Sequence, residues 1–264
     1  NWASAWLITG WNFMASLSIA RADRPHPRAF LRVFLLAVCL LVCLPLHGIW
    51  RLLRLRPPWP KLFLENAGRA AGCSVTITGA LSTRNALVVA IHVGWLDILV
   101  LAGKTGSAFV AKAEMAPWPL IGWLSKLNRT VFVDRERRLD VHWQAERMRA
   151  ALQTGQPLTL FPEGTTADGT MLLPFRSSLV AVATPPPDGV AIQPVAIDYG
   201  PPAPEIAWIG DEAIGANAMR VLSRPGRLHV TLHFLPPLDP ADFADRKAIT
   251  AHSREAIATR LGHG

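Results

Sequence analysis

The chain has 264 residues, long enough for one large or two small domains, and 50% of them are hydrophobic, which excludes a disordered chain. Charged residues make up only 17%, and the mean hydropathy of +0.25 indicates that part of the surface lies in lipid. The formal charge of +8 would suit a nucleic-acid partner if it were spread along the chain. Residues 1–61 carry eight basic groups and one acidic group, a charge of +7, whereas residues 62–264 carry +1. Because the basic excess is N-terminal, we expect no nucleic-acid partner.

Two apolar segments, residues 2–20 and 33–50, flank an arginine-rich turn, and each approaches the length that spans a bilayer. Two full spans would separate the cations of residues 21–32 from those of residues 51–61, against the positive-inside rule. A hairpin that dips into one leaflet keeps all eight cations among anionic headgroups. We therefore predict a monotopic, membrane-associated helical hairpin over residues 1–61. Two full spans, or a cleaved signal peptide for the first segment, remain alternatives.

From residue 75 onward, short β-branched runs alternate with amphipathic stretches, a pattern typical of an α/β domain. The predicted strands are residues 75–78, 87–91, 108–111, 130–133, 157–161, 190–197 and 227–234. The predicted helices are residues 95–101, 119–127, 139–154, 177–183, 211–222 and 242–261. We assign residues 62–264 to one catalytic domain.

The cysteines and the remaining histidines do not predict a metal site. Cys39 and Cys43 lie one helical turn apart in an apolar run, and Cys73 is isolated, so neither a disulfide framework nor a zinc spacing is present. His229 and His233 share one face of a predicted strand but have no evident third ligand. We expect no bound metal.

His92 follows directly on a predicted strand and stands five positions before Asp97. In α/β proteins, the end of a strand and the start of the next helix commonly carry the working side chains. A carboxylate at this spacing can hold one imidazole nitrogen protonated and leave the other free as a general base toward an alcohol. The chain has no G-x-S-x-G nucleophile elbow, so the substrate would supply the hydroxyl. The alternative is a chance His-x4-Asp spacing.

The run FPEGTT at residues 161–166 also follows a predicted strand. Gly164 permits close approach of a ligand to the backbone, while Glu163, Thr165 and Thr166 offer donors and acceptors to a polar headgroup. A tight turn capped by threonine is the alternative reading.

Three cations follow predicted strands or the FPEGTT run: Lys112, Arg135 and Arg176. Arginine is suited to bidentate binding of phosphate or carboxylate. Surface ion pairs with neighbouring acids are the alternative for Lys112 and Arg135, and a helix start is the alternative for Arg176.

Taken in order, these runs resemble the four sequence blocks of the glycerolipid acyltransferase family, whose members acylate glycerol 3-phosphate, lysophosphatidic acid and related lysolipids. His92 to Asp97 match block one and residues 130–135 match block two. Residues 161–166 match block three, and residues 190–197 match block four. Four blocks in the family's order are far more specific than any one of them.

The resemblance implies a mixed central sheet flanked by helices, as in glycerolphosphate acyltransferases, preceded by an N-terminal two-helix membrane motif. It implies that His92 and Asp97 activate the acceptor hydroxyl, and that Arg135 and the Glu163-Gly164-Thr165 run hold the acceptor headgroup. The donor would be an acyl carrier protein or coenzyme A thioester, so no cofactor is required. A place on the cytoplasmic face of a bacterial inner membrane, with its anionic leaflet, is also implied.

The chain departs from the family at three positions. Ile91 stands where many members have Asn, Gly94 where many have Ser, and Thr166 where many have Arg or Ser. The last departure removes a possible phosphate-binding cation. The run FPEGTTADG, with FRSSL at residues 175–179, is also similar to the branch that acylates lyso-ornithine lipid.

We therefore predict a membrane-bound O-acyltransferase with 1-acylglycerol 3-phosphate as the first-choice acceptor and lyso-ornithine lipid as the alternative. Backbone N–H groups at the helix start after Gly94 would stabilise the oxyanion. A non-catalytic lipid-binding protein and a thioesterase or lipid hydrolase are the alternatives from other functional classes.

Overall fold

The computed structural model describes residues 26–55, 57–133, 141–181, 188–239, 242–243 and 245–263. Within these ranges the strands form one seven-stranded sheet in the order β1-β7-β6-β2-β5-β3-β4. The neighbours are parallel except for the antiparallel pair β6 and β7. The strands are β1 (Cys73–Thr78), β2 (Ala86–Ala90), β3 (Ala108–Lys112), β4 (Val131–Val133), β5 (Leu158–Leu160), β6 (Ala191–Asp198) and β7 (Leu228–Phe234).

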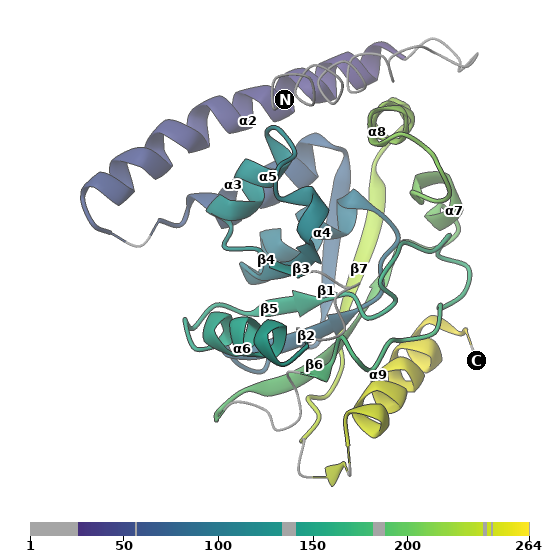
Figure 1. Cartoon of the computed structure of the whole chain (residues 1–264). Coiled ribbons are helices and arrows are strands. Elements are labelled where there is room, and N and C mark those ends of the chain that lie inside the picture. Colours follow the sequence, from purple (N-terminus) through teal and green to yellow (C-terminus); the bar gives the residue numbers. More distant parts are fainter. Residues whose placement is uncertain are drawn as a thin grey trace, which may run out of the picture.

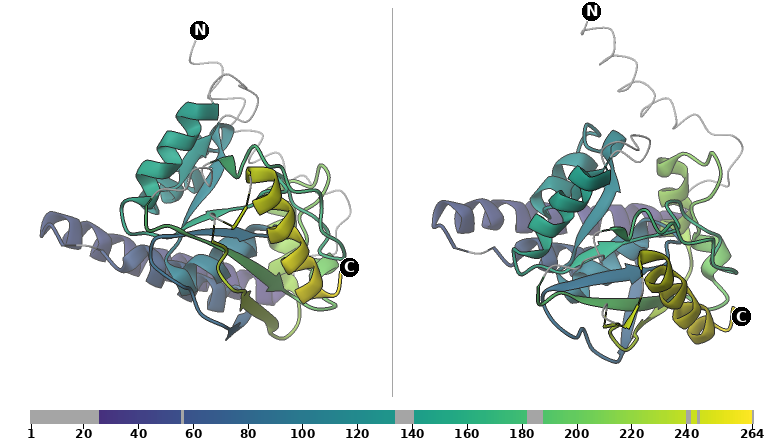
Figure 2. Two further views of the ribbon diagram at one scale, coloured as in Figure 1. Left: turned by 90° about the horizontal axis from the view of Figure 1, so that it is seen from below. Right: turned by 60° about the horizontal axis from the view of Figure 1, so that its bottom comes forward.

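Helices cover both faces of this sheet (Figures 1 and 2). The long helices are α2 (Pro27–Leu52), α3 (Trp59–Ala70), α4 (Trp95–Thr105), α6 (Val141–Leu152), α8 (Ile214–Ser223) and α9 (Arg246–Leu261). The short ones are η1 (Ala113–Met115), α5 (Ile121–Leu127) and α7 (Ala203–Ile206). In Figure 1, helices α2, α3, α4 and α8 lie in the upper half of the view, α6 lies in front of β5 and β2, and α9 lies at the lower right.

The central strand β2 explains why the sheet needs cover on both faces. All five of its residues are buried. Val88 packs in the hydrophobic cluster that includes α4, whereas Leu87 and Val89 pack in the cluster that includes α6. Because successive side chains of a strand point to opposite faces, an uninterrupted apolar run such as residues 86–91 is typical of a strand buried on both sides.

Helix α3 approaches α4 closely at Gly103, where an added Cβ would lie 2.7 Å from the Cα of Glu65. This contact holds α3 against α4, and α2 packs on α3. Arg32 of α2 donates from Nη1 to the carbonyls of Leu222 and Arg224, both at 3.0 Å, and from Nη2 to the carbonyl of Gly226 at 2.7 Å. At the other end of α2, Trp50 packs edge-on against Trp59 of α3, with ring centroids 5.2 Å apart. Both ends of α2 therefore contact the rest of the fold.

All seven predicted strands are present, with ends within two residues of those expected. The prediction of a helix at residues 177–183 is wrong for its described part, because residues 177–180 form a turn. Helix α3 was not predicted, and the expected domain boundary after residue 61 falls inside it. The first apolar segment, residues 2–20, lies outside the described residues, so the two-helix hairpin remains a prediction. Arg32, counted among the headgroup-facing cations, is instead bound to backbone carbonyls.

Candidate active site

His92 lies in the turn between β2 and α4, at the carboxyl edge of the parallel strands. Its Nδ1 is 2.7 Å from Oδ2 of Asp97. Because an ionised carboxylate only accepts hydrogen bonds, this contact assigns the proton to Nδ1 and leaves Nε2 as the basic nitrogen. No described group hydrogen-bonds to Nε2, and the side chain is 21% exposed. The predicted pairing of a base with an orienting carboxylate is present in the structure.

Asp97 occupies the third position of helix α4, and the start of this helix explains the His-x4-Asp spacing. Its Oδ2 also accepts the backbone N–H of Val93 at 2.7 Å and that of Gly94 at 2.9 Å. A carboxylate at this position commonly accepts the N–H of the N-cap residue, as in a capping box, and it lies in the favourable field of the helix N-terminus. Capping thus brings the carboxylate back to the imidazole at the strand end.

The other oxygen of Asp97 has a partner that was not predicted from the sequence. Tyr199, directly after β6, donates its hydroxyl to Oδ1 of Asp97 at 2.6 Å. Asp97 is fully buried, and Tyr199 is 4% exposed. Burial, followed by the nearby Asp97 charge, raises the pKa of Tyr199 well above its ordinary value, so the phenol stays protonated and acts as the donor.

Glu163 is buried beneath the histidine turn and braces it. Its Oε2 accepts the N–H of His92 at 2.8 Å, and its Oε1 accepts the N–H of Leu173 at 2.9 Å. Burial raises the pKa of Glu163 to about 6, although the two N–H groups oppose that shift. The resemblance assigned Glu163 to the acceptor headgroup, whereas the structure gives its carboxylate a supporting place inside the fold.

Phe161, at the end of β5, forms a wall of the site. The His92 ring stacks on it with centroids 4.1 Å apart and an interplanar angle of 9°. Phe109 of β3 also stacks on Phe161, with ring centroids 5.9 Å apart. Aromatic stacking of this kind limits rotation of the imidazole, so the ring and its Nε2 atom are held in one orientation.

The block-three turn requires glycine at one position. Gly164 has φ +76°, a conformation that side-chain-bearing residues rarely adopt, and its N–H donates to the carbonyl of Phe161. Thr165 is exposed beside it. Thr166 donates its hydroxyl to the carbonyl of Trp208, in the segment between α7 and α8, so this hydroxyl is already engaged within the protein.

The predicted cations differ in how far the structure describes them. Lys112 is exposed at the end of β3, on the same edge of the sheet as His92, because β2, β5 and β3 are parallel neighbours. Arg176 is exposed, and its backbone N–H donates to the carbonyl of Pro162, which ties it to the block-three turn. Arg135 lies outside the described residues.

Comparison with known proteins agrees with this geometry. The family described as Acyltransferase matches residues 74–198, which include β2, the histidine turn, the block-three turn and β6. A lyso-ornithine lipid O-acyltransferase of Rhodobacter capsulatus is 35% identical over 263 residues, covering 91% of this chain and 94% of the relative. This chain belongs to the acyltransferase family. It is an enzyme of the kind that transfers acyl groups to lysolipids, as predicted from the four blocks.

Two further relatives extend the comparison. A lyso-ornithine lipid O-acyltransferase of Rhizobium meliloti is 36% identical over 82% of this chain and 80% of the relative. A 1-acyl-sn-glycerol-3-phosphate acyltransferase of Neisseria meningitidis is 32% identical over 65% of this chain and 67% of the relative.

The fold also has a solved counterpart. The crystal structure of the 1-acyl-sn-glycerophosphate acyltransferase PlsC from Thermotoga maritima superimposes with a TM-score of 0.59 at 20% identity. The match covers 97% of this chain and 88% of that one. The expected mixed sheet flanked by helices is thereby confirmed.

Proposed function

We propose that this enzyme transfers a fatty acyl group from an acyl thioester to the free hydroxyl of lyso-ornithine lipid. The observation that carries the proposal is the long match to lyso-ornithine lipid O-acyltransferases, which reaches 94% of the Rhodobacter relative. The matches to 1-acyl-sn-glycerol-3-phosphate acyltransferases of Neisseria cover 67% of those relatives. This proposal reverses the order of acceptors that the sequence blocks alone suggested.

The block-three turn supports the same acceptor. Where many family members carry arginine or serine, this chain has Thr166, whose hydroxyl is bound to the carbonyl of Trp208. A lyso-ornithine headgroup carries a carboxylate and an ammonium in place of a phosphate, so it requires fewer cations. The exposed Arg176 and Lys112 offer cations for that carboxylate.

The chemistry follows from the free nitrogen of His92. Nε2 takes the proton of the acceptor hydroxyl while the hydroxyl oxygen attacks the thioester carbonyl. The tetrahedral intermediate then collapses and the C–S bond breaks. The imidazolium gives its proton to the leaving sulfur, so the product is a thiol and His92 is again the free base. Asp97 stabilises the imidazolium in between.

The oxyanion needs its own donors. Two backbone N–H groups of the histidine turn, those of Val93 and Gly94, already donate to Asp97. The N–H groups of Trp95 and Leu96, at the start of α4, therefore remain the candidates in the described turn. The thioester supplies the activation of the acyl group, so this scheme uses no cofactor; acyl carrier protein and coenzyme A thioesters are both compatible with it.

Membrane association is suggested by α2 and by the lipid-acylating relatives. Among the described residues, α2 is the one helix long and apolar enough to cross a bilayer by length and composition. Large apolar side chains exposed on it are Phe30, Leu31, Val33, Phe34, Leu35, Val38, Leu41, Val42, Ile49 and Leu52. Because both of its ends contact the domain, we propose that α2 lies along the surface of an anionic leaflet, on the cytoplasmic face of the inner membrane.

The acceptor is tested by presenting lyso-ornithine lipid, lysophosphatidic acid and glycerol 3-phosphate separately to the purified enzyme in vesicles, each with acyl carrier protein and coenzyme A thioesters. We expect the highest kcat/KM with lyso-ornithine lipid. A higher kcat/KM with lysophosphatidic acid would overturn the proposed acceptor. Thioester hydrolysis that is equal with and without lysolipid would instead indicate a thioesterase.

A further inference from the structure

We propose that Tyr199 is a positioning residue of the reaction, acting on His92 through Asp97. The four blocks assign no chemistry to the strand that ends beside Tyr199, and Tyr199 is the only tyrosine of the chain. The inference deepens the proposed function, on which it rests for the identity of the reaction. In this proposal, β6 positions the Tyr199 hydroxyl against the buried carboxylate of Asp97.

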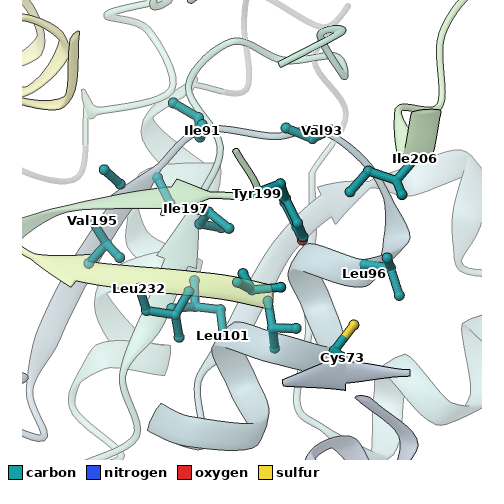
Figure 3. Packing of buried hydrophobic residues seen from close by; sticks show 14 of the residues in the cluster. Cys73, Ile91, Val93, Leu96, Leu101, Val195, Ile197, Tyr199, Ile206 and Leu232 are labelled. Carbon is teal, nitrogen blue, oxygen red and sulfur yellow. The ribbon is translucent and has the colours of Figure 1, made fainter. Parts of the chain in front are cut away.

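The sheet brings Tyr199 to this place. Strand β6 runs parallel to β2, with Ala90 level with Val195, and β6 continues to Asp198 while β2 ends in the histidine turn. Tyr199 therefore emerges beside that turn. Figure 3 shows its ring among Ile91, Val93 and other apolar side chains, with the hydroxyl directed toward the start of the helix that carries Leu96.

The hydrogen bonds of Asp97 divide between its two oxygens. Oδ2 receives His92 Nδ1 and the N–H groups of Val93 and Gly94, whereas the described contacts of Oδ1 consist of the Tyr199 hydroxyl. Because Asp97 is fully buried, water does not replace a lost donor at Oδ1. Phenylalanine at position 199 would fill the same space and leave that oxygen unpaired.

The hydroxyl has two effects on the base. It fixes the rotation of the carboxylate, and hence the direction of the imidazole that the carboxylate holds. It also disperses part of the carboxylate charge, which limits how strongly Asp97 stabilises the protonated imidazole. Removal of the hydroxyl therefore causes His92 to hold its proton up to a higher pH.

Two other titratable groups lie near Asp97 and have to be separated from this effect. Cys73 of β1 is buried, and burial raises the pKa of its thiol to about 12, so it stays neutral at the pH values of interest. Glu163 has its pKa raised to about 6 by burial and contacts the N–H of His92. The pH measurements are therefore repeated in a Glu163→Gln background, where the effect of Tyr199 should persist.

The test compares wild type, Tyr199→Phe and Thr159→Val in vesicles with the lysolipid that the wild type acylates. Thr159 is a matched control, because it is a fully buried hydroxyl on β5 without a hydrogen-bond partner in the described part of the chain. For Tyr199→Phe we expect kcat to fall about tenfold or more with an acceptor KM near the wild-type value, since the lost bond is to a charged group. Thr159→Val should keep the kcat and the acceptor KM of the wild type.

The same variants are compared by NMR titration of His92, which needs no substrate. We expect the midpoint of Tyr199→Phe to lie at a higher pH than that of the wild type. An inactive wild type would overturn the proposed function, and the titration would still decide the role of Tyr199. A folded Tyr199→Phe protein with unchanged kcat and an unchanged midpoint would overturn that role.

If Tyr199→Phe does not fold, the proposal is tested by replacing Tyr199 with 3-fluorotyrosine. Because the chain has one tyrosine, growth on 3-fluorotyrosine labels Tyr199 alone. Fluorine makes the phenol a stronger donor, so the His92 midpoint should move to lower pH, opposite to the effect of phenylalanine. A midpoint that stays in place or moves to higher pH would contradict the proposal.

Discussion

At the scale of single residues, the buried Glu163 links stability to pH. Its folded pKa of about 6 exceeds its ordinary value of 4.5, so its contribution to stability is complete below about pH 4.5 and is lost as the pH rises through about 6. Relative to Glu163→Gln, the free energy of unfolding of the wild type should fall by about 2 kcal/mol between about pH 4 and pH 7. Urea unfolding of both proteins at both pH values measures this difference. The same difference at both pH values would contradict the burial of a protonatable carboxyl group here.

Thr166 is the residue at which we expect a substitution to alter acceptor choice. In Thr166→Arg, a cation enters block three at the position where many family members carry arginine or serine. We expect the kcat/KM for lysophosphatidic acid, divided by that for lyso-ornithine lipid, to rise at least about tenfold, since a charge-assisted bond to phosphate is strong. Thr166→Val, which loses the bond to the Trp208 carbonyl without adding charge, is the control and should leave the ratio unchanged. An unchanged ratio in the arginine variant would show that block three does not select the headgroup.

The contact between His92 and Asp97 could be predicted from the sequence because it is local. Asp97 caps the helix that follows His92, so a spacing of five positions fixes the contact. Tyr199 could not be predicted in the same way, since it stands 102 positions after Asp97 and reaches it only through the pairing of β6 with β2. For Glu163 the position was found but its role was not, because a spacing in sequence does not reveal burial.

At the scale of elements, Arg32 attaches α2 to the domain. Its guanidinium donates to the carbonyl of Leu222 in the last turn of helix α8 and to those of Arg224 and Gly226 just after it, where cations are favoured by the unpaired carbonyls of a helix end. Arg32→Ala should lower the free energy of unfolding by about 2 kcal/mol and increase hydrogen exchange over residues 222–228. Arg51→Ala, which removes an exposed arginine near the other end of α2, is the control. Equal effects of the two substitutions would contradict the anchoring role of Arg32.

The elements that were predicted correctly are those with strong periodic patterns. The central strands β2 and β5 are fully buried apolar runs, and β6 is buried over most of its length, so their apolar residues leave little alternative to a strand in the core. Helix α3 was not predicted because Pro58 and Pro60 mark its start, although proline is well tolerated in the first turn of a helix. Residues 177–180 form a turn instead of the predicted helix, and the N–H of Arg176, just before them, pairs with the carbonyl of Pro162.

At the scale of the whole molecule, the apolar surface of α2 gives the enzyme a face suited to a bilayer. Phe34 and Leu41 are 62% and 71% exposed. Replacing both with aspartate should weaken binding to anionic vesicles at least about tenfold, because burial of each side chain contributes about 1.5–3 kcal/mol. Ile77→Asp, at a residue 44% exposed on β1, controls for general loss of surface hydrophobicity. Vesicle sedimentation measures binding, and equal binding of the double variant and the wild type would contradict a membrane role for the described part of α2.

We propose that His92 is the general base of an acyl transfer to lysolipid. The most direct measurement is the formation of the acylated lipid, followed by mass spectrometry, with wild type and His92→Ala bound to the same vesicles at equal amounts. We predict that His92→Ala loses at least about a thousandfold in product formation while its vesicle binding and its folding are retained. Acylated product formed at the wild-type rate by a folded His92→Ala enzyme would contradict the assignment.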